Sequence, residues 1–284
     1  MKKSKLFCAI VLALSTVMLL CIFTSCGNTT GNETSGGQAT EPADTTDAGN
    51  AKASDYESIK KKGKMVVGIT IYAPMNYEDE NGVLTGFDTE FAQAVAEKLG
   101  LTADFLIIDW DSKTFELESG SIDCVWNGMT LSDDVLNAMT CSDPYVINAQ
   151  VVVMAKDNLD SYPDAESMAS LKFAVESGSA GEDIAKENSF DYTAVAAQSD
   201  ALLEVASGAA DACIIDITMA NAMTGEGTSY ADLGFAVALS EEVYGVGFRK
   251  GSDMAEKVNA IFKEMKEDGT LYNLAHKYDL TLAD

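Results

Sequence analysis

The chain has 284 residues, which is enough for a sizeable core in one or two domains. It carries 45 acidic against 19 basic residues, a formal net charge of −26 at pH 7. Such a charge repels nucleic acid and anionic lipid headgroups, so no nucleic-acid partner is expected. Strong acidity is usually a solubility feature, and it favours cationic ligands only mildly.

The first 26 residues have the pattern of a secretion signal. Three lysines precede an apolar run over 6–23, and Thr24-Ser25-Cys26 follow this run. The small residues before the cysteine resemble a bacterial lipobox, so we predict a lipoprotein signal peptide over 1–25 and lipidation of Cys26. The alternative is an uncleaved membrane anchor, because the apolar run is nearly long enough to span a bilayer. Both interpretations place the rest of the chain outside the cytoplasmic membrane.

Residues 26–53 are predicted to be a flexible tether. They consist mainly of small and polar residues and include no aromatic one, so they cannot bury enough apolar surface to order themselves. A tether between a lipid and a domain suits a Gram-positive cell, where the domain must be kept from diffusing away. We therefore expect the protein on the outer face of the cell membrane.

From residue 54 onward the chain alternates between helical and strand patterns. A short helix over 54–62 ends at Gly63, and Asp88 is expected to cap a helix that ends at Gly100. Other helices are expected at 113–118, 132 onward, 182–188, 200–207 and 254–267. Strands are expected at 64–71, 103–108, 124–126, 151–154, 172–175, 233–239 and 244–249. This alternation indicates an α/β protein.

One stretch, 123–145, carries the most specific pattern. A short strand is followed by Asn127-Gly128-Met129-Thr130, where the glycine is expected to turn the backbone close to a ligand, and Ser132 is expected to cap the next helix. The stretch resembles a block of the polar-amino-acid solute-binding proteins of ABC importers. Their usual form is Gly-(Met/Ile)-Thr-hydrophobic-(Thr/Ser)-x-x-Arg, followed by Phe-Ser-x-Pro-Tyr. The opening Gly-Phe-Asp88 and closing Phe-x-Lys-Gly251 patterns extend the resemblance over about 65–278.

This resemblance implies a two-lobed periplasmic binding protein-like fold (type II) with a ligand cleft between the lobes. The first lobe would be discontinuous, 54–147 plus 240–284, and the second would be 148–239. Two hinge strands would join the lobes, which close on the ligand. The expected partners are an amino acid or amine ligand and ABC permease subunits with a cytoplasmic ATPase. A monomer without a cofactor is expected.

The family pattern also assigns candidate ligand contacts. They are Tyr72, Trp110, Asn127, Gly128, Thr130, Glu176, Ser179, Ala180 and Asp216. The resemblance implies that the two aromatics sandwich the ligand, that the loop at 176–181 binds its carboxylate in part, and that Asp216 takes its ammonium. Read alone, each aromatic could instead be core, and Asp216 could be a helix cap.

The sequence departs from the family pattern at Val135, where the family has the Arg that clamps the ligand's α-carboxylate. The chain's single Arg, Arg249, belongs to a closing strand motif and cannot replace it. Two interpretations remain. Thr130 and the amides near Ser179 could hold the carboxylate of an amino acid, cationic or atypical, or the ligand could be an amine without a carboxylate.

Other function classes have weaker support. A cyclohexadienyl, prephenate or arogenate dehydratase-like enzyme on the same fold could use Glu176 as its acid, but two substrate carboxylates would lack partners. A lipid-anchored sensor or adhesin also stays open. The sequence shows no Ser/His/Asp set, phosphate loop or metal-ligand cluster, so we expect neither an enzyme nor a metal site. Cys124, Cys141 and Cys213 are expected to be buried free thiols, and His276 a surface residue.

Overall fold

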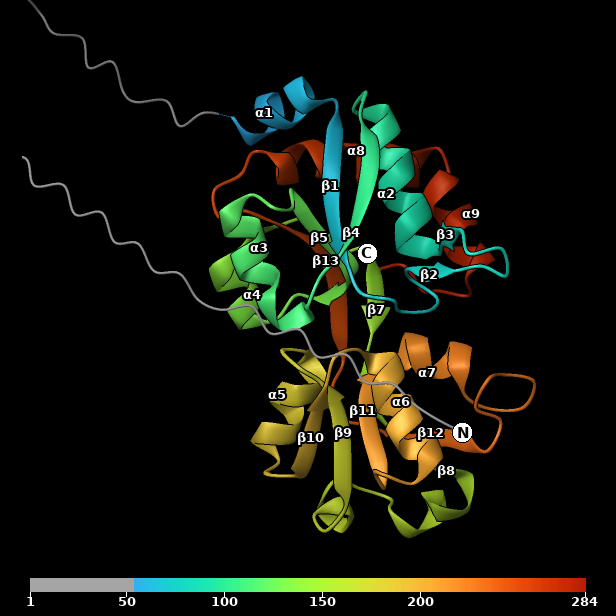
Figure 1. Ribbon diagram of the computed structural model, residues 1–284. Helices are drawn as coiled ribbons and strands as arrows, with labels where there is room; N and C mark the ends of the chain where they lie inside the picture. Colours follow the sequence, from blue (N-terminus) through green and yellow to red (C-terminus); the bar gives the residue numbers. More distant parts are fainter. Residues whose placement is uncertain (1–53) are drawn as a thin grey trace, which may run out of the picture. The chain divides into compact units, whose positions relative to one another are not determined.

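Two α/β lobes, each built around its own sheet, make up residues 54–284, the part of the chain that the computed structural model describes (Figure 1). The predicted signal peptide (1–25), the tether (26–53) and the lipidation site Cys26 lie outside these residues. Within 54–284, no helix combines the length and the apolar character needed to cross a membrane.

The sheet of the first lobe combines strands from both ends of the described chain. Its order is β4-β1-β5-β13-β6, with β7 also paired to β13. The strands are β1 (Lys64–Ile69), β4 (Thr102–Ile107), β5 (Cys124–Thr130), β6 (Thr140–Cys141), β7 (Val146–Asn148) and β13 (Glu242–Phe248). β1 runs parallel to β4 and β5, whereas β13 is antiparallel to β5, β6 and β7. A separate hairpin pairs β2 (Tyr77–Glu78) with β3 (Leu84–Thr85).

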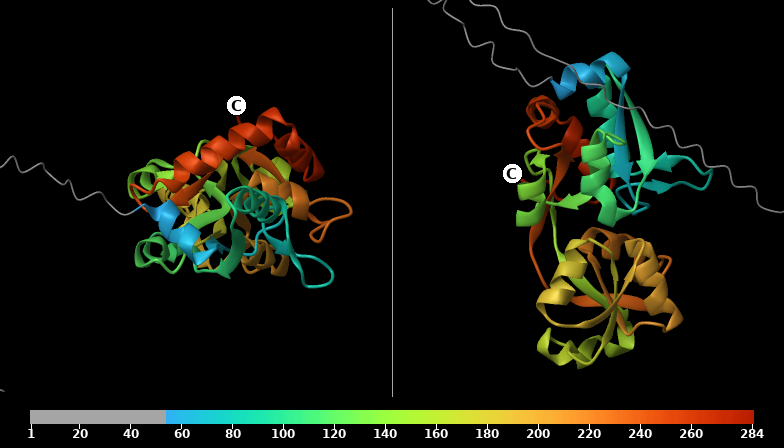
Figure 2. Two further views of the ribbon diagram at one scale, coloured as in Figure 1. Left: turned by 90° about the horizontal axis from the view of Figure 1, so that it is seen from above. Right: turned by 60° about the vertical axis from the view of Figure 1, so that its left-hand side comes forward.

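Helices from distant parts of the sequence cover this sheet. They are α1 (Asp55–Lys62), α2 (Phe87–Lys98), η1 (Trp110–Ser112), α3 (Lys113–Ser119), α4 (Asp133–Ala138), α8 (Met254–Glu267) and α9 (Thr270–Lys277). Figure 2 shows the C-terminal helices in red beside α2. The contact is aromatic: the rings of Phe91 in α2 and Phe262 in α8 stack with centroids 4.5 Å apart, and Trp126 packs against both.

The second lobe has a five-stranded sheet in the order β10-β9-β11-β8-β12. Its strands are β8 (Gln150–Ala155), β9 (Lys172–Glu176), β10 (Asp191–Val195), β11 (Ala212–Asp216) and β12 (Leu233–Ala238). Its helices are η2 (Lys156–Ser161), η3 (Glu166–Met168), α5 (Ala180–Glu187), α6 (Gln198–Ser207) and α7 (Ile217–Met223). The chain passes between the lobes at 148–150 and again at 238–242. The residue limits given for the two lobes remain a prediction.

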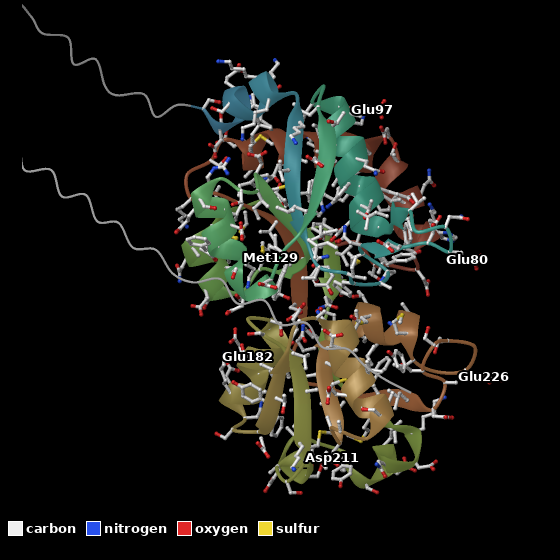
Figure 3. All side chains as sticks on the ribbon, in the orientation of Figure 1. Glu80, Glu97, Met129, Glu182, Asp211 and Glu226 are labelled. Atoms are coloured by element: carbon white, nitrogen blue, oxygen red, sulfur yellow. The ribbon has the colours of Figure 1, made fainter. Side chains whose placement is uncertain are left out.

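Most of the expected elements are present close to their expected positions. α8 occupies the expected 254–267, α1 ends at Gly63, and Ser132 caps α4 through a hydrogen bond from Val135 N. The strand β10 was not expected. Figure 3 labels five acids over both lobes; Glu80, Glu97, Asp211 and Glu226 are exposed and Glu182 is half-buried, which agrees with the solubility interpretation of the charge.

Two local expectations are wrong. No turn follows Trp126, because β5 continues through Gly128 to Thr130. Asp88 does not cap α2, whose N-cap is Gly86. Asp88 is instead fully buried, and its Oδ2 accepts hydrogen bonds from the Gly128 N–H at 2.6 Å and the Tyr145 hydroxyl at 2.9 Å. A buried carboxylate must find donors, and here they come from Gly128 of β5 and from Tyr145, and not from its own helix.

Candidate functional site

A cavity of about 250 Å³ is lined by residues of both lobes, and every predicted ligand contact lines it. Pockets for drug-sized ligands measure about 300–1,000 Å³, so this cavity is suited to a molecule as small as an amino acid. The lining residues predicted from the sequence are Tyr72, Trp110, Asn127, Gly128 and Thr130 of the first lobe, and Glu176, Ser179, Ala180 and Asp216 of the second. Their contact with a ligand remains a prediction.

The two predicted aromatics, Tyr72 and Trp110, are both buried in the cavity wall. The Tyr72 hydroxyl bonds to Thr218 of α7, in the opposite lobe, and lies 2.6 Å from the Tyr244 hydroxyl. Trp110 forms a cation–π contact with Lys113, whose Nζ lies 4.9 Å from the centre of the ring. Whether Trp110 and Tyr72 also stack on a ligand remains a prediction.

Asn127 and Gly128 line the cavity, but their polar groups serve the first lobe itself. The Asn127 amide bonds Thr70 through both Oδ1 and Nδ2, and also donates to Asn76 Oδ1 at 2.7 Å. The Gly128 N–H goes to Asp88, as described above. These groups already have partners within the first lobe, and the contact of Asn127 and Gly128 with a ligand remains a prediction.

Thr130 lies at the end of β5, and its hydroxyl donates to Glu242 Oε1 at 2.7 Å. Glu242 belongs to the hinge strand β13 and also accepts from the side-chain amides of Asn148 and Gln150. The same two amides donate to Asp216. Thr130 is thereby connected to the acids of the cavity through the hinge.

Glu176 and Asp216 are two buried acids that line the cavity, each only 2% exposed. Burial, and next the Asp216 carboxylate, raise the pKa of Glu176 to about 8. Burial, and next Glu242, raise the pKa of Asp216, although Gln198, Asn148 and Gln150 all donate to it. Glu176 Oε1 has no hydrogen-bond partner within 54–284. Two buried acids with raised pKa favour a bound cation, because an opposite charge stabilises their ionised forms.

Ser179 and Ala180 form the start of α5. The Ser179 hydroxyl caps the helix by accepting from Glu182 N, and Ala180 is the first helical residue, whose N–H has no intrahelical acceptor. The preceding Gly178 has a φ of +70°, and a Cβ placed on it would lie 2.8 Å from Asp111 Cα of the other lobe. A glycine is needed at this close approach between the lobes.

Comparison with known proteins places this arrangement in a family. The family of bacterial extracellular solute-binding proteins, family 3, matches residues 65–281. The chain belongs to this family. The L-cystine-binding protein TcyA of Bacillus subtilis (strain 168) is 34% identical over 247 residues, which cover 81% of this chain and 86% of that protein. The L-cystine-binding protein TcyJ of Escherichia coli (strain K12) is 30% identical over 234 residues, with 78% and 84% coverage.

Solved structures of amino-acid-binding proteins share the two-lobed fold. An ancestral arginine-binding protein bound to arginine aligns with a TM-score of 0.71 and 34% identity, covering 76% of this chain and 98% of that one. The ancestral amino acid-binding protein AncCDT-1, described as a precursor of cyclohexadienyl dehydratase, aligns with a TM-score of 0.72 and 32% identity, with 79% and 99% coverage. The expected fold class is confirmed.

Val135 of this family 3 protein lies on α4 and lines the cavity where the Arg of the family pattern is expected. Arg249 lies elsewhere and is structural. Its guanidinium bonds Asp55, Asp123 and the carbonyls of Leu117 and Ile122, which connects α1 with the end of α3. The expectation that Arg249 cannot act as the clamp is confirmed.

The side chains not expected from the sequence include Lys113, Gln150 and Gln198, which line the cavity, and Glu242, which accepts hydrogen bonds from Thr130 and Gln150. Lys113 is the one basic residue among those of 54–284 that line the cavity. Burial lowers its pKa, while the neighbouring acids, Glu176 first, act in the opposite direction. Its position three residues after an aromatic at the start of a helix was visible in the sequence. The two glutamines and Glu242 carried no such signal.

The remaining reactive groups lie outside the site. Cys124 and Cys213 are buried free thiols as expected, whereas Cys141 is only half-buried, and all three are unbridged. His276 is exposed on α9, as expected. Within 54–284, no three His, Cys, Asp or Glu side chains are grouped so that they could hold a metal ion.

Proposed function

We propose that the chain is the extracellular, lipid-anchored solute-binding component of an ABC importer, which binds an amino acid and delivers it to a membrane permease. Membership of family 3 supports extracellular solute binding. The lipobox at Cys26 and the tether over 26–53 support an anchor on the outer face of the membrane. Relatives named for cystine and arginine support an amino acid as the ligand class.

The pair of buried acids, Glu176 and Asp216, carries the proposal. Within 54–284 neither forms an ion pair with a basic side chain, and both line a cavity of amino-acid size. An unpaired buried carboxylate is unfavourable, so a ligand that brings an ammonium relieves a penalty that the free protein carries. With two such acids, an amino acid with a second positive charge fits best.

Delivery to the permease requires a closed state that differs from the open one. Hydrogen bonds beside the cavity join the lobes, among them one from the Tyr72 hydroxyl to Thr218 and one from Lys113 Nζ to the Gly178 carbonyl at 2.8 Å. Both can form only when the lobes approach. We infer that a ligand between the lobes stabilises this state by adding its own contacts to both sides.

Thermal unfolding of the full chain with each amino acid, and with its decarboxylated amine, tests the proposal. A ligand at 100 times its Kd stabilises a protein by about 2.7 kcal/mol, which raises the Tm of a domain of this size by several degrees. We expect the largest shifts with cationic amino acids. Shifts with amines alone would assign a ligand class without a carboxylate, and no shift with either class would refute solute binding of this kind.

One observation favours a second candidate, a cyclohexadienyl dehydratase-like enzyme. Glu176 has its pKa raised to about 8, as a general acid at neutral pH requires, and AncCDT-1 is named as a precursor of such an enzyme. Incubation with arogenate or prephenate, followed by ultraviolet detection of the aromatic product, decides this candidate. Product formation that Glu176→Gln abolishes would establish it.

A further inference from the structure

The cavity contains a cation that the family pattern does not predict. Lys113, the first residue of α3, extends its ammonium toward the second lobe. Nζ donates to the Trp110 carbonyl at 3.3 Å and to the Gly178 carbonyl at 2.8 Å, and it lies over the Trp110 ring. Its ammonium is held at three points, so its position in the cavity wall is well defined.

This ammonium has no anionic partner in direct contact. Among residues 54–284, no carboxylate oxygen lies within 4.0 Å of Lys113 Nζ. Lysine has three N–H donors, and the carbonyls of Trp110 and Gly178 accept two of them. One donor and the full positive charge therefore remain available to an anion in the cavity.

A further donor for the same anion lies across the cleft. Ala180, two residues after the carbonyl that Lys113 contacts, opens α5 with an N–H that has no intrahelical acceptor and also lines the cavity. A helix start of this kind favours negative charge. The acids that face Lys113 are Glu176 and Asp183 of the cavity wall, together with Glu182 and Asp111. They surround the lysine without pairing with it.

We propose that Lys113 binds the carboxylate of the ligand, in place of the Arg that the family pattern has at Val135. The charge is supplied from α3 and not from α4. The cavity is then complementary to a zwitterion, with the carboxylate at Lys113 and Ala180 and the ammonium groups at Asp216 and Glu176. This inference rests on the proposed function and narrows it: the substrate class is the α-amino acid, and a bare amine of the same length is discriminated against.

The test is the ratio of affinities for an amino acid and its decarboxylated amine, measured by calorimetry on the full chain. The probe pairs are L-arginine with agmatine, L-lysine with cadaverine, and L-cystine with cystamine. Whichever pair binds, we expect the wild type to prefer its amino acid over its amine by at least about tenfold. A ratio of this size corresponds to the free energy of one charge-assisted hydrogen bond. Lys113→Met should reduce this ratio to about one, with the amine bound as before.

Matched variants separate a contact with the ligand from a role in folding. Lys113→Arg should keep the preference. Lys186→Met removes another lysine of the cleft region, one that pairs with Glu182 and Asp183, and should leave the ratio unchanged. Val135→Arg added to Lys113→Met should restore the preference from the other helix, and this rescue also shows that the lysine variant folds.

Each outcome decides the inference. A lost preference that Val135→Arg restores supports it. Equal weakening of both probes in Lys113→Met overturns it, because the lysine would then act only as a contact between the lobes, and an unchanged ratio overturns it as well. A wild-type protein that binds no amino acid contradicts the proposed function itself. This failure can be told apart from a failure of the inference about Lys113, because the wild type is measured before any variant.

Discussion

The carboxylates of Asp216 and Glu242 accept hydrogen bonds from the same two amides, Asn148 Nδ2 and Gln150 Nε2. Asp216 ends β11 in the second lobe, whereas Glu242 opens the hinge strand β13. The two like charges are held together by neutral donors, and within 54–284 neither has a basic partner. In the proposed function, a ligand cation beside Asp216 would offset this repulsion next to the hinge and would thereby couple the charge of the ligand to lobe closure.

Asp216→Asn is expected to weaken binding of any ammonium ligand by about 30-fold or more. The substitution keeps the shape of the side chain but removes the charge that faces the ligand, and the loss of a buried charged partner amounts to about 2–5 kcal/mol. Calorimetry with the best amino acid of the thermal screen measures the change. Glu226→Gln, which neutralises an exposed acid of the same lobe, is the control and should bind normally. Unchanged affinity in Asp216→Asn would remove this residue from the site.

Binding of a cationic ligand is expected to tighten as the pH rises from 6 to 8. The pKa of Glu176 is raised to about 8 in the free protein, so in this range the acid is largely protonated and must lose its proton to pair with a cation. One linked proton changes the affinity by up to about tenfold per pH unit. Calorimetry in buffers of different ionisation enthalpy should detect the released proton, and Glu176→Gln should reduce both effects to the part that comes from Asp216, whose pKa is also raised. A pH-independent Kd would show that Glu176 does not meet the ligand's charge.

The fold was predictable because local signals agree with it. The helix over 254–267 shows apolar residues at helical spacing, among them Val258, Ile261 and Met265, and all three are buried in the structure. Caps such as Ser132 depend only on neighbours in the sequence. The positions that line the cavity followed from the family pattern, since equivalent positions on equivalent strands end at the same cleft.

The partners of those site residues were not predictable, because tertiary pairing decides them. The side-chain amide of Asn127 is hydrogen-bonded to Thr70, 57 residues away, and the Gly128 N–H donates to Asp88, 40 residues away. The role of Lys113 depends on the distance across the cleft to Gly178, which no periodicity records. For the same reason the sequence could show that an Arg is absent at Val135, but not that another cation lines the cavity.

Val135→Arg in the otherwise unchanged chain is expected to separate the ligand classes. Val135 lines the cavity, so an Arg there adds a second cation for a carboxylate. An amino acid should bind about tenfold tighter or better, while the corresponding amine should bind more weakly because of repulsion between cations. Competition between the two probes on one sample measures the ratio directly. An amine that binds more tightly to this variant would contradict the assignment of the ligand's carboxylate to this side of the cavity and of its ammonium to the side of Asp216 and Glu176.

The ligand-free protein is expected to lose stability as the pH rises from about 5 to 8. Asp88 and Glu176 have pKa values raised to about 7 and about 8, mainly by burial, and the pKa of Asp216 is raised as well. Since these acids ionise near pH 4 when unfolded, the folded state holds protons in this window that the unfolded state has released. Stability therefore falls with pH. The acids whose pKa is lowered in the fold, such as Asp79 and Asp253, affect stability only below this window.

Each unit of pKa difference corresponds to about 1.4 kcal/mol, so we expect a loss of at least about 2 kcal/mol between pH 5 and pH 8. Urea denaturation at a series of pH values measures the free energy of unfolding. Glu176→Gln should reduce the slope, because one of the protonated acids is removed. A saturating cationic ligand should have the same effect, since it stabilises the ionised acids. A flat profile would mean that Asp88, Glu176 and Asp216 are solvated or paired in solution.

Gly128→Ala is expected to damage both stability and binding, and Gly120→Ala provides a matched comparison. Both glycines have positive φ, +55° and +78°, where an alanine costs about 1–2 kcal/mol. A Cβ on Gly120 meets no atom within 4 Å, whereas one on Gly128 would lie 2.6 Å from Cε1 of the buried Tyr72. That overlap adds about 1–3 kcal/mol and displaces an aromatic of the cavity wall from its bonds to Thr218 and Tyr244.

Urea denaturation of the two glycine variants should therefore show a larger loss for Gly128→Ala, and only this variant should lose affinity for the ligand. The comparison separates the conformational effect, which both variants share, from the contact with Tyr72, which only one has. Equal losses of stability with unchanged affinity would mean that Tyr72 can shift without consequence. Its place in the cavity wall would then be incidental, and the glycine would be needed only for the backbone of β5.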